Sequence, residues 1–469
     1  MYDLVIANGK VVTPGGVRNC SLGVRGAEIA ILSAEKLEGQ RTIDATNKVV
    51  LPGAIDPHVH LELPFQAQGT ISADDFYQGT VAAAFGGVTS VIDFAIHGKD
   101  VDILDHIQAR RELADPKVVV DYSFHPSFTA ETQRNLDYVQ KLIEMGMPTF
   151  KLYLPYKREG LHVGDGFLFK MLQETHRHNG LVLIHAENAD VVEQLMQEQE
   201  ARGNLSWMQH YDSRPNFVEG TSIATSIELA KAAGSALYVV HLSTEEGLNH
   251  LRQAQHQGYA IMMESCPQYL EFTKDVYARE DGLNYIMTPP LRLKKDNEAL
   301  WRGIERGEIP CMGTDHCPFS TDQKLLGREL FSKVPNGGMG VETLLPYMFS
   351  EGVNKGRISL SRLAQLLSEN TTKIHGLQRK GSLEVGKDAD IVIVDPQLKR
   401  TVTAEAMHTN SDYSIYEGKE LTGWPVVTIS RGEVIVEDGK LKAERGRGKF
   451  VERAISPEVL NAAPQGGLA

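Results

Sequence analysis

The stretch Val49-Val50-Leu51-Pro52-Gly53-Ala54-Ile55-Asp56-Pro57-His58-Val59-His60 decides the fold of this chain. Its apolar first half predicts a short strand over residues 49–56 that is buried on both faces. Because side chains alternate along a strand, His58 and His60 face the same way, about 6–7 Å apart at their Cα atoms. Two imidazoles at one strand end can bind one metal ion. An isolated His-x-His also occurs where an ordinary strand meets a loop, so its partners further along the chain decide.

From about residue 50 to 315, short apolar runs alternate with helix-length segments such as 189–203 and 222–233. Eight β/α units over this length predict an α/β fold of the (β/α)8 TIM-barrel type. A doubly wound open sheet is the rival, but it usually has fewer strands and a Gly-rich first turn, which this sequence lacks. The eight expected strands are 49–56, 89–94, 118–124, 148–154, 181–185, 236–241, 260–264 and 310–315.

Both ends of the chain have β-like sequence. Residues 4–12 predict a strand, an Asn8-Gly9 turn and a second strand, and 22–26 and 29–32 continue the pattern. After a helical segment at 359–367, strands are expected at 381–383, 389–395 and 426–432. The tail at 462–467 is expected to be loose.

Composition limits the classes of function. The 469 residues are 42% hydrophobic and 23% charged, which is globular and long enough for a large domain and a smaller one. The net charge of −13 argues against nucleic acid or an anionic membrane as partner. No apolar run approaches the length of a membrane span, and the N-terminus lacks a signal-peptide pattern. The four cysteines have no paired spacing, which predicts free thiols and a cytoplasmic location.

Metal-capable side chains recur where the expected barrel strands end, which is where this fold carries its functional groups. Any one of them has an ordinary explanation, such as a hydrogen-bonded histidine or an aspartate in a turn. Six such groups on five strand ends predict a shared metal site at one end of the barrel. They are His58, His60, Lys151, His185, His241 and Asp315.

The sequence resembles the amidohydrolase superfamily, and within it the cyclic amidases hydantoinase and dihydropyrimidinase. The resemblance implies a TIM barrel over residues 51–374 and a β-sandwich built from 1–50 and 375–469, to which Gly381–Asp390 returns the chain. The motifs that carry it, in the family's order, are 52–60, Phe150-Lys151-Leu152-Tyr153, His185-Ala186-Glu187-Asn188, Tyr238-Val239-Val240-His241-Leu242-Ser243, Cys266-Pro267-Gln268-Tyr269-Leu270, Pro289-Pro290-Leu291-Arg292, Asp315-His316-Cys317-Pro318-Phe319 and Pro335-Asn336-Gly337-Gly338.

The resemblance implies two Zn²⁺ ions per subunit, although other divalent ions are compatible with the ligands. His58, His60 and Asp315 would bind one ion, and His185 and His241 the other. Lys151 would bridge them as N6-carboxylysine, since an ammonium would repel both cations whereas a carbamate is an anion with two oxygens. A bridging hydroxide would then hydrolyse the cyclic amide of a hydantoin or dihydropyrimidine to an N-carbamoyl amino acid, with Asp315 as general acid and base.

Three further residues match substrate-binding positions of the family. Tyr156 would support the oxyanion, and Thr288 and Asn336 would hold the imide edge of the ring. The loops at 61–70 and 153–162 would enclose the ring substituent, with Leu63, Phe65, Tyr153 and Leu154 as apolar walls. Many hydantoinases place an aromatic residue a few positions after the tyrosine, whereas this chain has Glu159-Gly160-Leu161. The substituent size and the preferred enantiomer are therefore left open.

Several alternatives remain at this stage. Dihydroorotase would need a basic residue soon after the His-x-His, but the chain has the anionic Glu62 there. An allantoinase-like cyclic amidase stays open, as does a non-catalytic dihydropyrimidinase-like adaptor, although such adaptors lose metal ligands that this chain retains. The family also implies a homotetramer or homodimer that acts on a small cyclic imide or ureide.

Overall fold

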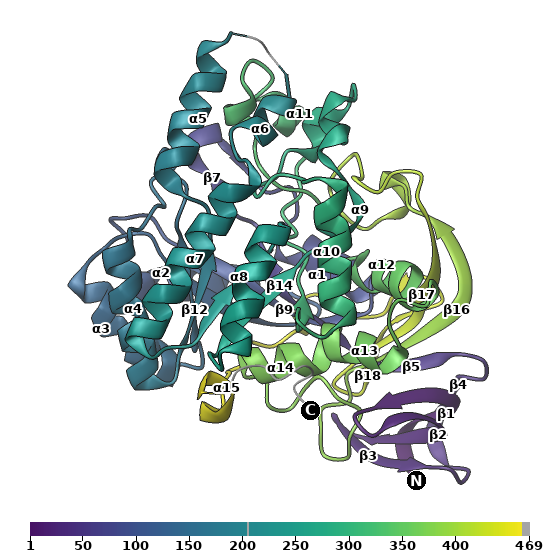
Figure 1. Ribbon diagram of the computed structural model, residues 1–469. Helices are drawn as coiled ribbons and strands as arrows, with labels where there is room; N and C mark the ends of the chain where they lie inside the picture. The colour runs from purple at the N-terminus through teal and green to yellow at the C-terminus, as the bar shows by residue number, and fades with distance from the viewer. Residues whose placement is uncertain (204–205, 462–469) are drawn as a thin grey trace.

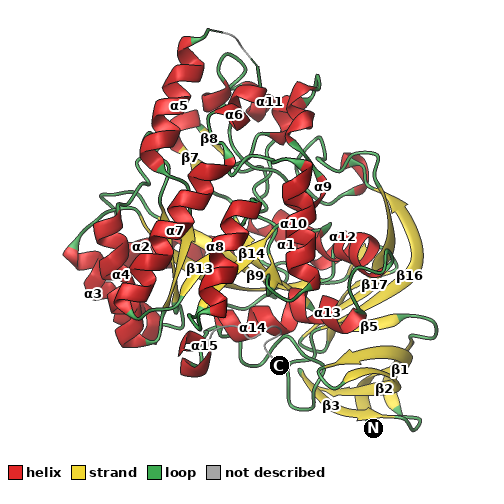
Figure 2. Ribbon diagram, in the orientation of Figure 1, coloured by secondary structure: helices red, strands yellow, loops and turns green. Residues whose placement is uncertain are grey.

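Two large sheets organise the computed structural model, which describes residues 1–203 and 206–461 (Figure 1). One is an eight-stranded parallel sheet with the order β15-β14-β13-β12-β11-β10-β9-β6, so that strands consecutive in this series are neighbours. Helices surround it on the outside (Figure 2). This is the TIM barrel that the sequence predicts.

Each of the eight expected barrel strands overlaps an observed one. The third begins at Asp121, three residues later than predicted, because the Val118 carbonyl bonds to Gly448 N rather than to a barrel strand. The barrel strands are β6 (Ala54–Val59), β9 (Val88–Ile96), β10 (Asp121–Phe128), β11 (Thr149–Tyr153), β12 (Leu181–His185), β13 (Leu237–Val239), β14 (Ile261–Ser265) and β15 (Cys311–Met312).

The first and last strands meet through contacts at their carboxyl ends. The backbone N–H of His60 donates to the carbonyl of His316 at 2.8 Å. The buried carboxylate of Asp56 accepts from Thr314 N at 3.1 Å and from Thr314 Oγ1 at 2.5 Å. These bonds draw the strand carrying His58 toward the segment carrying Asp315.

The single strand predicted over residues 49–56 is wrong, because the run divides at Gly53 between the two sheets. Strand β5 (Val49–Pro52) pairs with β1 and β16, whereas β6 pairs with β9. Gly53 donates its N–H to Asp390 O at 2.9 Å, and a Cβ at this position would lie 2.2 Å from Thr89 Oγ1. Only glycine permits so close a passage from one sheet to the other.

The predicted Asn8-Gly9 hairpin turn is also wrong. Strand β1 (Tyr2–Thr13) runs through it, and the pairing with β2 shifts between Ile6 and Gly9, which face Leu22 and Cys20. Asn8 has a φ of 61°, the left-handed conformation found in one type of β-bulge. The Asn-Gly pair therefore bends the strand instead of reversing it.

The second sheet has nine strands drawn from both ends of the chain, seen in Figure 1 where purple and yellow-green strands meet. The strand expected at 381–383 does not form, although Leu383 packs in the core of this sheet. The limits placed at residues 50 and 374 stay a prediction, and the tail at 462–467 lies outside the described residues. The strands are β1, β2 (Gly16–Arg25), β3 (Glu28–Ser33), β4 (Gly39–Asp44), β5, β16 (Ile391–Thr401), β17 (Glu420–Ser430), β18 (Glu433–Glu437) and β19 (Lys440–Leu441).

The helices form because their apolar residues recur at helical spacing, as in α3, where Leu136, Val139 and Leu142 are buried. The segments at 189–203 and 222–233 are helical as predicted, whereas 359–367 is a short α-helix followed by a π-helix over Gln365–Glu369. The helices are α1 (Phe76–Phe85), α2 (Ile103–Ala114), α3 (Gln133–Glu144), α4 (Asp165–His178), α5 (Ala189–Ala201), α6 (Met208–Asp212), α7 (Asn216–Ala233), α8 (Glu245–His256), α9 (Pro267–Glu271), α10 (Lys294–Glu305), α11 (Thr321–Leu325), α12 (Leu344–Tyr347), α13 (Leu360–Ala364), α14 (Asn370–His375) and α15 (Pro457–Asn461).

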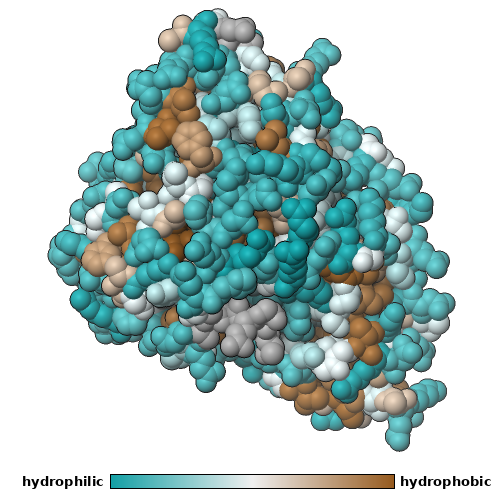
Figure 3. All heavy atoms as spheres, in the orientation of Figure 1, coloured by the Kyte–Doolittle hydropathy of each residue, from teal (hydrophilic) through white to brown (hydrophobic). Residues whose placement is uncertain are grey.

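The outer surface agrees with helices that bury one side only. The face in Figure 3, where α7, α8 and α10 lie in Figure 1, is mostly hydrophilic. None of the helices within residues 1–203 and 206–461 is both long and apolar enough to cross a membrane.

Candidate metal centre

The six metal-capable residues all lie at the carboxyl end of the barrel, which we call the mouth. His58 belongs to β6, Lys151 to β11, and His185 is the last residue of β12. His60, His241 and Asp315 follow β6, β13 and β15 within three residues. Parallel strands bring their carboxyl ends to the same side of the sheet, so the six side chains converge there.

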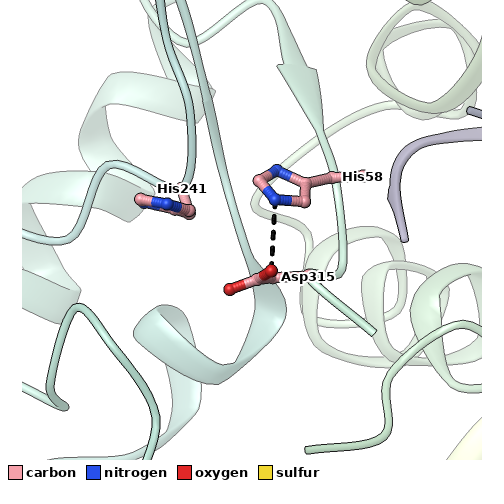
Figure 4. A group of neighbouring side chains, drawn as sticks. All are labelled: His58, His241 and Asp315. Carbon is pink, nitrogen blue, oxygen red and sulfur yellow. Dashed lines mark ion pairs between the residues drawn. The ribbon is translucent and has the colours of Figure 1, made fainter. Parts of the chain in front are cut away.

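Three of them come closest together. Ligand atoms of His58, His241 and Asp315 all lie within 4.8 Å of one another (Figure 4). His58 Nε2 is 3.1 Å from Asp315 Oδ1, and His60 Nε2 is 3.0 Å from the same oxygen. The ring of His185 lies 4.4 Å from that of His241 between centroids. Asp315 therefore stands beside one histidine pair, with the second pair adjacent.

Lys151 is buried in the same place, with only 1% of its surface exposed. Its Nζ lies 4.9 Å from the centres of the Phe94 and Tyr153 rings. Burial lowers the pKa of Lys151 to about 7, against the opposing charge of Asp315. A neutral amine is therefore accessible near neutral pH, which an ordinary lysine does not offer.

Two carboxylates outside the set of six contact two of its histidines, His58 and His185. Glu264 binds His58 Nδ1 with one oxygen and accepts from the Tyr238 hydroxyl at 2.8 Å with the other. Glu187 Oε2 lies 2.9 Å from His185 Nε2 and accepts from Arg214 at 2.6 Å. Such partners fix which ring nitrogen of each histidine faces the mouth.

Burial and the neighbouring carboxylates change the pKa values of the histidines in opposite directions. Burial lowers the pKa of His60 and His185 to about 4, which keeps both imidazoles neutral. At His58 burial acts the same way, but the carboxylates of Asp315 and Glu264 outweigh it and raise the pKa to about 9. His58 lies between the carboxylates of Asp315 and Glu264. The negative charge of these two groups would favour a bound cation.

The backbone is strained at this end of the barrel. His241, Asp315 and Tyr156 have φ values of 40°, 55° and 65°. Residues other than glycine adopt this conformation at a cost of roughly 1–3 kcal/mol each, and such residues cluster at functional sites. The strain at these residues therefore indicates a functional site at the mouth, independently of the resemblance.

The three predicted substrate contacts lie around the mouth. The Tyr156 ring is 5.0 Å from that of His185. The Thr288 hydroxyl donates to Asn336 Oδ1 at 2.9 Å, so the structure brings these two residues together. The segment that carries Asn336 is bonded to the loop that follows β15, because Cys317 N, two residues after Asp315, donates to Gly338 O at 2.9 Å.

A sequence model of the Amidohydrolase family matches residues 49–435 of this chain. The chain belongs to the amidohydrolase family. It is 38% identical to a D-hydantoinase of Geobacillus stearothermophilus over 456 residues, 96% of each chain. The solved D-hydantoinase of Bacillus sp. AR9 has a TM-score of 0.94 at 38% identity, covering 97% of this chain and 100% of its own. A dihydropyrimidinase from Brevibacillus agri has the same TM-score at 36% identity, covering 96% and 99%. The chain thus falls in the hydantoinase and dihydropyrimidinase branch.

The amidohydrolase family implies a divalent metal centre, and the residues at the mouth fit one. His58 Nε2 is buried without a hydrogen bond although it faces Asp315, and His58 Nδ1 is already taken by Glu264. Glu187 contacts Nε2 of His185 and therefore does not occupy Nδ1 of that ring. Imidazole nitrogens and carboxylate oxygens are the ligands that Zn²⁺ takes in proteins. The outer partners thus leave one nitrogen of His58 and one of His185 available to a divalent ion at the mouth.

Sequence reasoning missed the outer partners. Glu187 stands inside a motif that carries the resemblance, two residues after His185, so its proximity is a usable signal. Glu264 ends a predicted strand, which places it at the mouth. Arg214 gives no signal, because it follows the short helix α6 and reaches Glu187 only through the fold.

One step of the substrate argument is wrong. Glu62 does not present a free charge, because its carboxylate contacts Lys117 Nζ at 2.6 Å. Its charge therefore gives no reason to disfavour an acidic ring. Residues 61–65 contain no basic side chain, and the similarity to hydantoinases supports the choice of substrate.

The loop at 153–162 contacts helix α5 and bonds to itself. Arg158 forms ion pairs with Glu193 at 2.8 Å and Glu200 at 2.6 Å, both on α5. Leu161 N donates to Tyr156 O at 3.1 Å, which closes the loop on itself. Of the expected apolar walls, Leu63, Tyr153 and Leu154 are buried and Phe65 packs on Phe319 with ring centres 4.9 Å apart.

Proposed function

We propose that this protein hydrolyses the cyclic amide bond of hydantoins or dihydropyrimidines and releases N-carbamoyl amino acids. The observation that carries the proposal is the convergence of His58, His60, Lys151, His185, His241 and Asp315 at one barrel mouth, in a chain similar along its whole length to hydantoinases. Water adds to the ring carbonyl carbon, the C–N bond breaks, and the nitrogen takes up a proton.

The residues that would hold two divalent ions, which we propose to be zinc, divide into two sets. His58, His60 and Asp315 would bind one, and His185 and His241 the other. A bound pair of such ions supplies Lewis acidity, which makes water acidic and polarises a carbonyl. Glu264 and Glu187 orient the first histidine of each set.

Lys151 would bridge the two positions as a carbamate. Its neutral amine would attack CO₂, forming an N–C bond and releasing one proton. The buried position and the pKa of about 7 supply that neutral amine. The product is an anion with two oxygens, which neutralises charge where a lysine ammonium would repel cations.

The remaining roles belong to groups around the substrate. Asp315 would accept the proton of the attacking water and give it to the departing ring nitrogen. The Tyr156 hydroxyl would donate to the oxygen that becomes negative as the carbonyl is attacked. Thr288 and the Asn336 backbone would hold the imide edge and so fix the ring above the nucleophile.

A substrate panel tests the proposal. It comprises dihydrouracil, dihydrothymine, hydantoin, 5-substituted D- and L-hydantoins, allantoin and dihydroorotate, assayed before and after chelation of metal. We expect dihydrouracil or a 5-monosubstituted hydantoin to be hydrolysed well above dihydroorotate, and chelation to abolish turnover. Preferential hydrolysis of allantoin or dihydroorotate would overturn the substrate class. Failure to hydrolyse any member would favour the non-catalytic adaptor.

Two finer statements belong with the proposal. We propose a homotetramer or homodimer, which light scattering on the purified protein would distinguish from a monomer. We also propose a cytoplasmic location, with which the four free cysteines are compatible.

A further inference from the structure

Helix α11 (Thr321–Leu325) follows the loop that carries Asp315. Two of its side chains, Gln323 and Lys324, bond to other segments near the mouth. It is held at its start by a reciprocal cap, in which Gln323 N donates to Ser320 Oγ and Ser320 N donates to the Gln323 side chain. The amide of Gln323 also donates to Thr70 Oγ1 at 2.8 Å and to Ile71 O at 2.6 Å, both in the segment between β6 and α1. The next residue, Lys324, binds two other segments.

Lys324 is completely buried, and its partners are three backbone carbonyls. Its Nζ donates to Ile286 O at 2.7 Å, to Pro335 O at 2.7 Å and to Gly337 O at 2.8 Å. Burial lowers the pKa of Lys324 to about 7, whereas the three carbonyl acceptors favour the protonated form, whose three N–H donors they match fully. The Phe319 ring, whose centre is 5.4 Å from Nζ, covers the group on another side.

These carbonyls flank the proposed substrate contacts. Pro335 and Gly337 are the neighbours of Asn336, so Lys324 fixes the Asn336 backbone from both sides. Ile286 is two residues before Thr288, whose hydroxyl donates to Asn336 Oδ1 at 2.9 Å. Gly337 N donates to Ile286 O at 3.1 Å, which joins the two segments directly as well.

The arrangement depends on the lysine. Without it, the buried carbonyls of Pro335 and Gly337 would lose their donor, and Ile286 O would keep only Gly337 N; a buried carbonyl without a donor is costly. The backbone at Gly337 packs closely against the loop that follows β15, since a Cβ there would lie 2.4 Å from Cys317 O. The lysine thus sets the distance between the Thr288 and Asn336 segments.

We propose that Lys324 is a positioning residue for substrate: it fixes the Asn336 backbone and the Thr288 hydroxyl where they bind the imide edge of the ring. This role rests on the function proposed above. Lys324 does not touch the ring itself, so it acts through the geometry of the two segments. A displacement of about 1 Å in such contacts can cost 10²-fold in rate.

The test uses two variants of the metal-loaded full-length protein and a matched control. Lys324→Met keeps the length of the side chain without any donor, and Lys324→Gln keeps two N–H donors on a shorter stem. The control is Lys380→Met, which removes another buried lysine, bonded to Asp121 and Asp390 near the amino ends of the strands. KM, kcat, metal content and thermal stability are measured on the panel member that the wild type hydrolyses fastest.

We expect Lys324→Met to raise KM by at least about tenfold with metal content unchanged, and Lys324→Gln to raise it less. Lys380→Met should lose stability but keep the wild-type KM. If Lys324→Met does not fold, Lys324→Gln decides alone. A folded Lys324 variant with KM within twofold of wild type would overturn the positioning role. Failure of the wild type to hydrolyse any panel member would instead refute the proposed function.

Discussion

Replacing Glu264 by glutamine would test whether the outer carboxylate prepares His58 for a metal. The amide oxygen can still accept from His58 Nδ1, and its NH₂ group would face the Tyr238 hydroxyl, now 2.8 Å from the carboxylate. The tyrosine proton could turn toward Cys311 Sγ, 3.0 Å away. Shape and hydrogen bonds are thereby retained, and the variant mainly removes one negative charge behind the imidazole.

The expected magnitude follows from that geometry. Loss of an outer partner of a metal-binding histidine typically costs 10- to 100-fold in metal affinity, or about 1.4–2.7 kcal/mol. Because Glu264→Gln keeps the hydrogen bond, we expect a loss of about 10-fold. Glu264→Ala loses both the bond and the charge, so we expect about 100-fold.

Metal affinity is measured by titrating the metal-free protein with Zn²⁺ against a competing chelator, and kcat is then measured at saturating metal. Tyr238→Phe is the control, since it removes the bond to the other Glu264 oxygen and the contact with Cys311 Sγ but leaves the carboxylate on His58, and it should change affinity less than Glu264→Gln. Unchanged affinity in a folded Glu264→Ala protein would refute the argument that this carboxylate orients His58.

Two further substitutions separate chemistry from stability. Asp315→Asn keeps the size but removes the proton acceptor and weakens one metal position, so kcat should fall by at least about 10²-fold, and a near-normal kcat would remove Asp315 from acid–base catalysis. Lys380→Met leaves the buried carboxylates of Asp121 and Asp390 without this cation. Denaturant titration should show a loss of about 3 kcal/mol, near the lower end for a broken buried pair because Arg431 still neutralises Asp121, and a loss below about 1 kcal/mol would contradict this.

The sequence predicts the barrel well because its parallel strands are buried on both faces and therefore form short continuous apolar runs. The same regularity predicts the mouth: a histidine that ends such a run, as His185 does, must lie at the carboxyl end of the sheet. The order of the strands is therefore enough to predict that His58, His60 and Asp315 converge.

Features that depend on distant partners could not be predicted. The run from Val49 to His60 looks continuous, and its division at Gly53 is set by pairing of β5 with β16, more than 300 residues away. Asn8-Gly9 suits a hairpin turn or a bulge equally, and the pairing with β2 decides. No sequence pattern indicates the role of Lys324, since its three acceptors come from segments that only the folded chain brings together.

The central claim is that Lys151 bridges two metal ions held by the five other mouth residues. A high-resolution crystal structure of the zinc-loaded protein, with anomalous scattering recorded at the zinc edge, tests it most directly. We predict one peak at His58, His60 and Asp315, a second at His185 and His241, and density for a carbamate on Lys151 between them. An unmodified Lys151 amine beside two occupied zinc positions would contradict the account.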